Sequence, residues 1–172
     1  MLMRVRCVLA TVALALVPAA LAAQRPEVAP LGAYLGRWHS VGESHATKFS
    51  KAGSSTADLE CRWSAGGRFL ACDMRIVAGG DSIEQLSAYG PADSGRFALY
   101  AVTPGGRPAY FSRVTIAGNT WTYENPNAPA TGTRWRTINE WVAPGEMHWR
   151  AQFSEDGEHW TTTNEGVSTR VG

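Results

Sequence analysis

Apolar and polar residues alternate with a period of two along most of the chain after residue 36, and short clusters of Gly, Pro, Asn and Asp interrupt the alternation. Such alternation is typical of half-buried β-strands, because successive side chains of a strand point to opposite faces of the sheet. The pattern predicts ten strands, at 37–46, 56–64, 68–78, 82–90, 96–103, 109–117, 119–125, 132–142, 146–154 and 158–170.

The interruptions are turn signals that join one predicted strand to the next. Gly66-Gly67, Gly79-Gly80, Gly118-Asn119 and Asp156-Gly157 supply residues that favour tight hairpin turns. Consecutive hairpins favour an up-and-down meander, and closing such a sheet removes its exposed edges. We therefore predict an all-β fold, a single antiparallel up-and-down β-barrel of about ten strands.

A short apolar segment precedes the first predicted strand. Leu31, Tyr34 and Leu35 are spaced i, i+3 and i+4, which predicts one helical turn over 31–35. This short N-terminal helix would plug one end of the barrel. Residues 24–30 hold two prolines, and we expect them to form an extended lead-in.

Residues 1–23 have the pattern of a signal peptide. Arg4 and Arg6 precede an apolar run of ten residues, Val8 to Val17, which is too short to span a bilayer. Ala20-Leu21-Ala22 has the form of a cleavage site, so we expect cleavage near Ala22-Ala23 and a periplasmic or secreted domain over 24–172. The alternative is an uncleaved membrane anchor.

The charge of the mature chain disfavours a nucleic-acid partner. Removing Arg4 and Arg6 takes the 16 basic residues to 14 against 15 acidic ones, a net charge of −1. Nucleic-acid-binding domains usually carry a basic stripe instead. After the leader no segment is long and apolar enough to predict a membrane span. Composition does not indicate an oligomeric state.

Cys61 and Cys72 remain after the leader is removed. A hairpin turn centred on Gly66-Gly67 pairs residue 63 with 70 and residue 61 with 72, so the two cysteines face each other across the hairpin. An exported compartment is oxidising and permits a disulfide. With a two-residue turn this pair is expected at a hydrogen-bonded position, where side chains lie farther apart. The alternative is two buried free thiols.

The alternation also predicts which residues face the interior. The inward set of the first hairpin is Leu59, Cys61, Trp63, Leu70, Cys72, Met74 and Ile76, and that of the later strands is Trp135, Thr137, Asn139, Trp141, Trp149, Ala151 and Phe153. An inverted barrel, the alternative, would bury Glu60, Arg62, Asp73, Arg75, Arg136, His148 and Arg150 instead.

Several short motifs carry a family resemblance. They are Gly36-Arg37-Trp38 at the first strand, Glu60-Cys61-Arg62-Trp63 leading into Gly66-Gly67-Arg68-Phe69-Leu70, Ser154 to Trp160, and Arg170 near the end. With these motifs the chain resembles secreted bacterial lipocalin-like proteins, β-barrels of the calycin type. The resemblance implies a barrel that holds a small molecule, and it implies that Arg170 packs over Trp38 through a cation–π contact. Other lipocalin signature stretches are not recognisable.

Our first functional hypothesis is a container for a small apolar or aromatic molecule. Its predicted ligand-binding residues are Trp63, Tyr89, Tyr123, Trp135, Asn139 and Trp141, with Tyr110 as a further source of a hydroxyl group. Asn139 is the best polar contact, because a buried amide needs a hydrogen-bond partner. The same aromatic residues are alternatively a solid core, which would leave a non-catalytic envelope protein with a filled barrel.

An enzyme of the same fold is a further hypothesis, in which carboxylate, Arg and His side chains on the charged face act on a small aromatic or carbonyl compound. No nucleophile motif identifies catalytic residues. The histidines, His39, His45, His148 and His159, lack metal-ligand spacing, so we expect no metal site and no cofactor. His148 as a haem ligand is a minor alternative to an exposed histidine.

Overall fold

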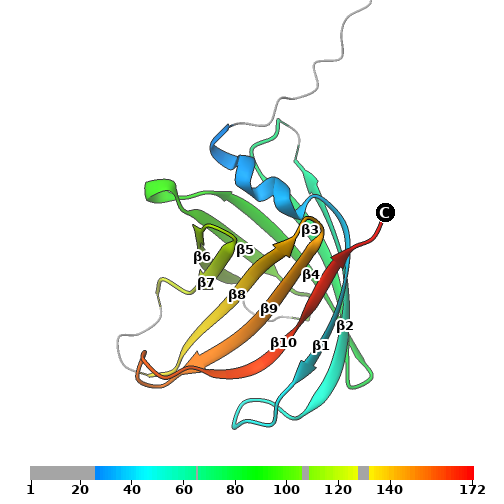
Figure 1. The fold of residues 1–172 in the computed structure, drawn as a ribbon, viewed down its shortest axis with the longest axis vertical. Coiled ribbons are helices and arrows are strands. Elements are labelled where there is room, and N and C mark those ends of the chain that lie inside the picture. Colours follow the sequence, from blue (N-terminus) through cyan, green and yellow to red (C-terminus); the bar gives the residue numbers. More distant parts are fainter. Residues whose placement is uncertain (1–25, 65, 106–108, 128–131) are drawn as a thin grey trace, which may run out of the picture.

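Ten antiparallel strands close into one barrel in the computed structural model, which describes residues 26–64, 66–105, 109–127 and 132–172 (Figure 1). The predicted signal peptide, residues 1–23, lies outside the described residues. The strands are β1 Gly36–Ser44, β2 Gly53–Trp63, β3 Leu70–Ala78, β4 Asp81–Pro91, β5 Phe97–Val102, β6 Tyr110–Ala117, β7 Thr120–Glu124, β8 Arg134–Ala143, β9 Glu146–Ser154 and β10 Thr161–Arg170.

Each strand pairs with its neighbours in the sequence, and β1 pairs with β10 to close the sheet. The predicted up-and-down barrel of about ten strands is therefore confirmed. Two-residue glycine turns contribute to this order. Gly79 and Gly80 have φ values of 60° and 88°, and they join the paired residues Ala78 and Asp81 at the β3–β4 hairpin. Positive φ at both central positions matches the right-handed twist of the flanking strands.

A helical segment covers one end of the barrel, as predicted, but it is longer than one turn. It is a 3-10 helix, η1 Pro26–Tyr34, so the expected extended lead-in was wrong from residue 26 onward. A proline's fixed φ is compatible with a 3-10 helix, whose dihedral angles lie close to it. Val28, Leu31 and Tyr34 are buried and tie η1 to the barrel core. Within the described residues, no helix combines the length and the hydropathy required to cross a bilayer.

The start of the last strand also differs from the prediction. It begins at Thr161 and not at residue 158. The Asp156 carboxylate accepts hydrogen bonds of 2.8 Å from the backbone N–H groups of Glu158 and His159. These two amides are therefore engaged in an Asx-type turn and do not enter the sheet.

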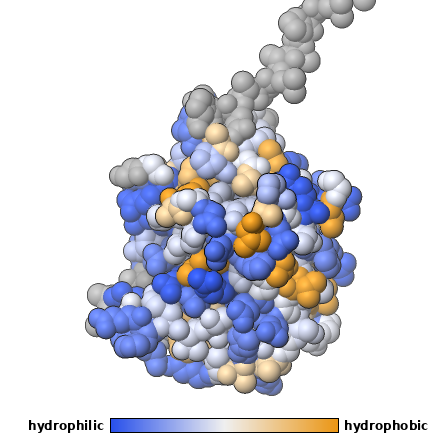
Figure 2. Space-filling model, viewed as in Figure 1, coloured by the Kyte–Doolittle hydropathy of each residue, from blue (hydrophilic) through white to orange (hydrophobic). Residues whose placement is uncertain are grey.

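The predicted inward and outward faces of the first hairpin are confirmed. Cys61, Leu70 and Cys72 are buried, whereas Asp58, Glu60, Arg62, Asp73 and Arg75 are exposed. The inverted barrel is thus excluded. The face seen in Figure 2 is mostly hydrophilic, with small hydrophobic patches separated by polar side chains.

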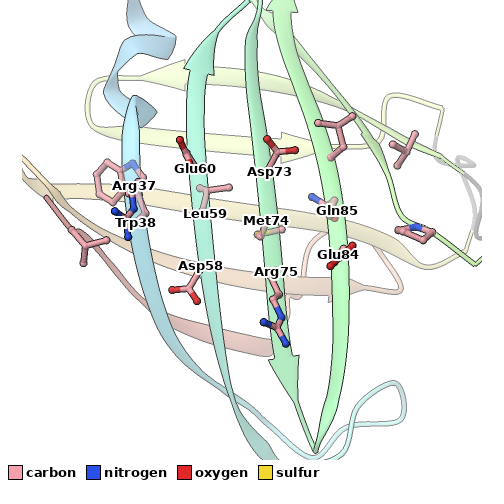
Figure 3. Close-up of a pocket in the computed structure, with 14 residues that line it drawn as sticks. Arg37, Trp38, Asp58, Leu59, Glu60, Asp73, Met74, Arg75, Glu84 and Gln85 are labelled. Atoms are coloured by element: carbon pink, nitrogen blue, oxygen red, sulfur yellow. The ribbon is translucent and has the colours of Figure 1, made fainter.

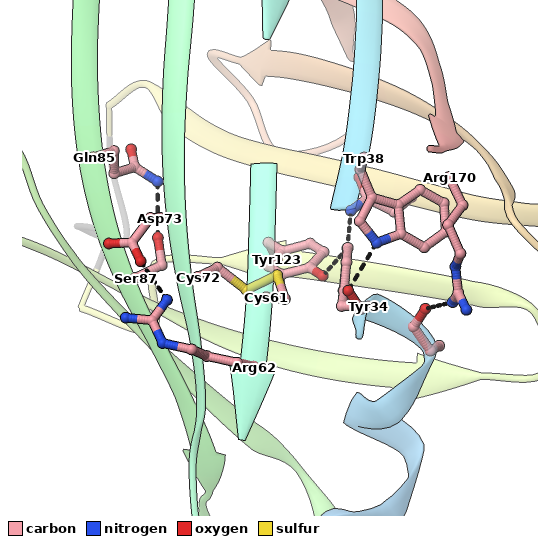
Figure 4. Close-up of a disulfide and its surroundings, with 12 residues drawn as sticks. Tyr34, Trp38, Cys61, Arg62, Cys72, Asp73, Gln85, Ser87, Tyr123 and Arg170 are labelled. Atoms are coloured by element: carbon pink, nitrogen blue, oxygen red, sulfur yellow. Dashed lines mark hydrogen bonds and ion pairs between the residues drawn. A yellow bond between two sulfur atoms is a disulfide. The ribbon is translucent and has the colours of Figure 1, made fainter. Parts of the chain in front are cut away.

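Cys61 and Cys72 form a disulfide across the β2–β3 hairpin (Figure 4). They are register partners with Cα atoms 4.1 Å apart. The expected hydrogen-bonded position was wrong. The Ser64 N–H donates to the Phe69 carbonyl at 2.8 Å, so alternation from that pair places residues 61 and 72 at a non-hydrogen-bonded pair, where side chains lie closer.

Candidate functional site

Aromatic side chains fill the end of the barrel that η1 covers. The Trp141 ring meets the rings of Tyr34, Trp38 and Trp121 edge to face, with centroid distances of 5.0, 5.5 and 5.6 Å. The Trp38 Nε1–H donates to the Tyr34 carbonyl at 2.8 Å and holds the end of η1 against β1 (Figure 4). These aromatic side chains form a solid core at this end of the barrel, and we call that core the plug.

Beyond the plug the barrel holds a partly open cavity of about 370 Å³. Hydroxyl and amide side chains line part of it: Ser40, Gln85, Ser87, Ser112, Thr137 and Ser168. Apolar side chains line the rest, among them Leu59, Met74, Ile76, Leu99, Met147 and Trp149. Among the described residues that line the cavity, none has a charged side chain.

A cluster of phenols and one amide lies where the plug meets the cavity. The Tyr34 and Tyr123 hydroxyls are 2.6 Å apart, and the Asn139 Nδ2 donates to the Tyr34 hydroxyl. Burial raises the pKa of Tyr34 to about 12. It also raises the pKa values of Tyr89 and Tyr123 well above 10, so all three phenols are neutral hydrogen-bonding groups near pH 7.

The predicted ligand-binding residues divide into two groups. Tyr89, Tyr123 and Asn139 line the cavity, and so does Tyr110. Trp63, Trp135 and Trp141 are not among the lining residues. Trp63 packs against the buried core opposite Leu70, and Trp141 belongs to the plug.

Trp135 lies at the rim of the barrel opposite the plug. Its side chain is 45% exposed, and it contacts Phe49 and Phe153 with centroid distances of 5.0 and 5.7 Å. Lys48 lies over the Phe49 ring at 4.9 Å and pairs with Glu155. Phe49 of the β1–β2 loop thereby joins Trp135 and Phe153 in an aromatic cluster at this rim of the barrel.

The charged residues of the enzyme hypothesis lie on the outer face. A broad groove of about 850 Å³ runs over β1–β5, and Asp58, Glu60, Asp73, Arg75 and Glu84 are among the residues that line it (Figure 3). Arg37 and Arg75 are the basic residues among the described lining residues, and Asp73 pairs with Arg62 beside the groove. Exposed pairs of this kind are ordinary surface features of a strand.

Each of the four histidines lies within hydrogen-bond distance of a surface carboxylate. His148, the minor haem candidate, is half-exposed and lies 3.1 Å from Glu146. His45 lies between the cross-strand neighbours Glu43 and Glu165, with Nε2 2.9 Å from Glu165, and the three groups have ligand atoms within 4.8 Å. No local pattern in the sequence predicts this group, because 120 residues separate His45 from Glu165.

Two further residues line the cavity but are not in the predicted ligand-binding set. The sequence pattern places Tyr34 only in the N-terminal helix, yet its hydroxyl reaches the cavity and contacts Asn139. Trp149 was predicted to face inward but was not assigned to the ligand site, although it lines the cavity. The register across β8 and β9, which places Trp149 opposite Asn139, is the signal that would have found it.

The comparisons with known proteins support the fold. No protein-family model matches the sequence, and no curated protein matches it. The crystal structure of Rv2717c from M. tuberculosis is similar, with a TM-score of 0.62 and 14% sequence identity. The match covers 87% of this chain and 100% of that one. At this identity the likeness shows a shared fold alone.

Proposed function

We propose that this protein is an exported, lipocalin-like barrel that binds one small neutral molecule in its central cavity. The observation that carries the proposal is the uncharged cavity of about 370 Å³ inside a closed barrel. Ligand pockets typically have volumes of roughly 300–1,000 Å³ and combine apolar walls with a few polar groups. The cavity has both features, whereas a completely filled barrel would have neither.

The composition of the lining supports a neutral ligand. A buried charge is unfavourable unless an opposite charge or several hydrogen bonds compensate it. The described lining residues supply hydroxyl, amide and phenol groups but no Lys, Arg, His, Asp or Glu. An apolar or aromatic molecule with a small number of hydrogen-bonding groups matches this lining best.

Two further observations support the lipocalin-like and exported character. The Arg170 guanidinium lies 4.8 Å from the centre of the Trp38 ring, the contact that the family resemblance implies. The Cys61–Cys72 disulfide is compatible with an oxidising compartment, where a chain with a signal peptide would fold.

Native mass spectrometry and a ligand titration test the proposal. The protein would be purified from its own host, and any small molecule found with it, together with a panel of neutral aromatic and aliphatic compounds, would be titrated by tryptophan fluorescence. We expect saturable binding of neutral compounds and none of their charged analogues.

A pair of matched variants places the binding inside the barrel. Ala57→Phe adds a ring to a residue that lines the cavity, and Ala71→Phe adds the same ring on the outward face of β3. We expect the first to abolish binding and the second to leave it intact, with folding checked by circular dichroism. Binding that survives Ala57→Phe, or a panel with no ligand, would overturn the proposal.

A further inference from the structure

Two glycines face each other at the seam where the first and last strands pair. Gly42 in β1 and Gly166 in β10 are register partners, and Trp149 in β9 is the partner of Gly166. A Cβ atom at Gly42 would lie 2.6 Å from the Trp149 Cζ2, and one at Gly166 would lie 2.8 Å from it. At Gly42 the six-membered ring of Trp149 is the nearest obstacle to a side chain, whereas at Gly166 the backbone oxygen of Val41 is nearer still. Glycine within a strand often marks such a close approach.

This arrangement fixes where the indole lies. With its six-membered ring over the two glycines, Trp149 lies against the barrel wall while still lining the cavity. It is the only tryptophan among the described lining residues. The glycine pair thus leaves room in the cavity beside a large aromatic surface.

Asn139 lies on β8 and is the register partner of Trp149 on the neighbouring strand β9. Its side chain is buried, with 8% exposure, and its Nδ2 donates to the Tyr34 hydroxyl. Its Oδ1 is also buried and accepts no hydrogen bond from any described residue. Buried polar atoms are usually paired. Because Asn139 lines the cavity, a turn of its amide would present this unpartnered acceptor to a ligand donor.

We propose that Trp149, seated on the Gly42–Gly166 pair, and Asn139 opposite it select a neutral ring-containing ligand that carries a hydrogen-bond donor. The ring packs against the Trp149 indole, and the donor, a phenolic O–H or an N–H group, reaches the Asn139 Oδ1. This inference rests on the proposed function and specifies the ligand class of the same cavity.

Three probe molecules test the contributions of the ring and of the hydrogen-bond donor to binding separately. 2-Naphthol has both a ring system and a donor, 2-methoxynaphthalene has the ring system but no donor, and 1-decanol has a donor but no ring. We expect calorimetry to show the tightest binding for 2-naphthol. The ether should bind about tenfold more weakly, because the Asn139 acceptor stays unpaired, and the aliphatic alcohol several-fold more weakly, because it lacks aromatic contact with Trp149.

Two variants test the role of Asn139. Asn139→Leu should weaken 2-naphthol about tenfold and leave the ether unchanged, whereas Thr122→Val, which removes a polar group from β7 outside the cavity lining, should change neither. A second measurement, which does not use the Asn139 variant, is an NMR spectrum of the indole N–H groups in ¹⁵N-labelled protein. The signal that disappears in Trp149→Phe should shift most when 2-naphthol is added.

The outcomes distinguish this inference from the proposed function. Equal binding of 2-naphthol and its ether, tighter binding of 1-decanol, or an unshifted Trp149 signal would overturn the Trp149–Asn139 element while the barrel remained a container. If none of the three probes and no member of the wider panel bound, both proposals would fail together.

Discussion

The Arg170 guanidinium lies 4.8 Å from the centre of the Trp38 ring, and the two residues are register partners across the seam that closes the barrel. The same guanidinium donates from Nη2 to the Ala33 carbonyl at 2.9 Å (Figure 4). One side chain near the C-terminus thus contacts both the first strand and the end of η1. Arg170 therefore links the closure of the barrel to the packing of η1 against it.

We expect Arg170→Ala to lower the free energy of unfolding by about 1–2 kcal/mol, through loss of a cation–π contact and one hydrogen bond. Urea denaturation would measure the change. Arg68→Ala, which removes an exposed arginine from the β2–β3 turn, is the matched control and should change stability by less than about 0.5 kcal/mol. Equal effects of the two variants would contradict a specific role for Arg170.

The disulfide gives a second prediction. Cys61 and Cys72 are 11 residues apart in the sequence, and closing a loop of this length should contribute about 2–3 kcal/mol. We expect Cys61→Ala/Cys72→Ala to remain folded but to unfold at a lower urea concentration by that amount. Adding a reductant should destabilise the native protein and leave the double variant unchanged. The same response in both would show that the bridge is not the cause.

The buried phenols predict a loss of stability at high pH. The pKa of Tyr34 is raised to about 12 in the folded protein, and that of an unfolded tyrosine is about 10. The unfolded chain therefore loses its phenolic protons first as pH rises. The stabilising contribution is complete below pH 10 and should be lost progressively between about pH 10 and pH 12.

Urea titrations across this range, together with phenolate absorbance, would measure that loss. Tyr89 and Tyr123 have pKa values raised in the same direction, so their absorbance should change only as the protein unfolds. Tyr34→Phe should reduce the pH dependence without removing it. The measurement would use a Tyr100→Phe/Tyr110→Phe background, which removes the two exposed tyrosines. In that background, phenolate absorbance that rises near pH 10 in a fully folded protein would contradict the burial of the other three hydroxyls.

The strand order and the register of the first hairpin could be predicted from the sequence, because both depend on local signals. Gly66-Gly67 places the turn, and the turn fixes the pairing of Cys61 with Cys72. The period-two alternation then decides which side chains point inward. These features need no knowledge of distant parts of the chain.

The candidate site was only partly predictable, because alternation gives the face of a residue but not its height along the barrel axis. Asn139 and Trp141 share the inward face of β8, yet Asn139 lines the cavity and Trp141 packs in the plug. The difference arises from Tyr34, whose ring meets Trp141 and whose hydroxyl meets Asn139. How far η1 enters the barrel is a property of the assembled core.

The contact between Gly42 and the Trp149 ring predicts an energetic coupling. A Cβ at Gly42 would meet Cζ2 and Cη2 of Trp149 at 2.6 and 2.9 Å, and the backbone oxygen of Glu165 at 2.9 Å. We expect Gly42→Ala to destabilise the protein by about 1–3 kcal/mol, as overpacking usually does. In a Trp149→Leu background the ring is absent, and the same substitution should cost at least about 1 kcal/mol less.

The double-mutant cycle would be measured by urea denaturation. Additive effects would show that the backbone near Gly42 resists a side chain by itself, and that the ring of Trp149 is not what excludes one.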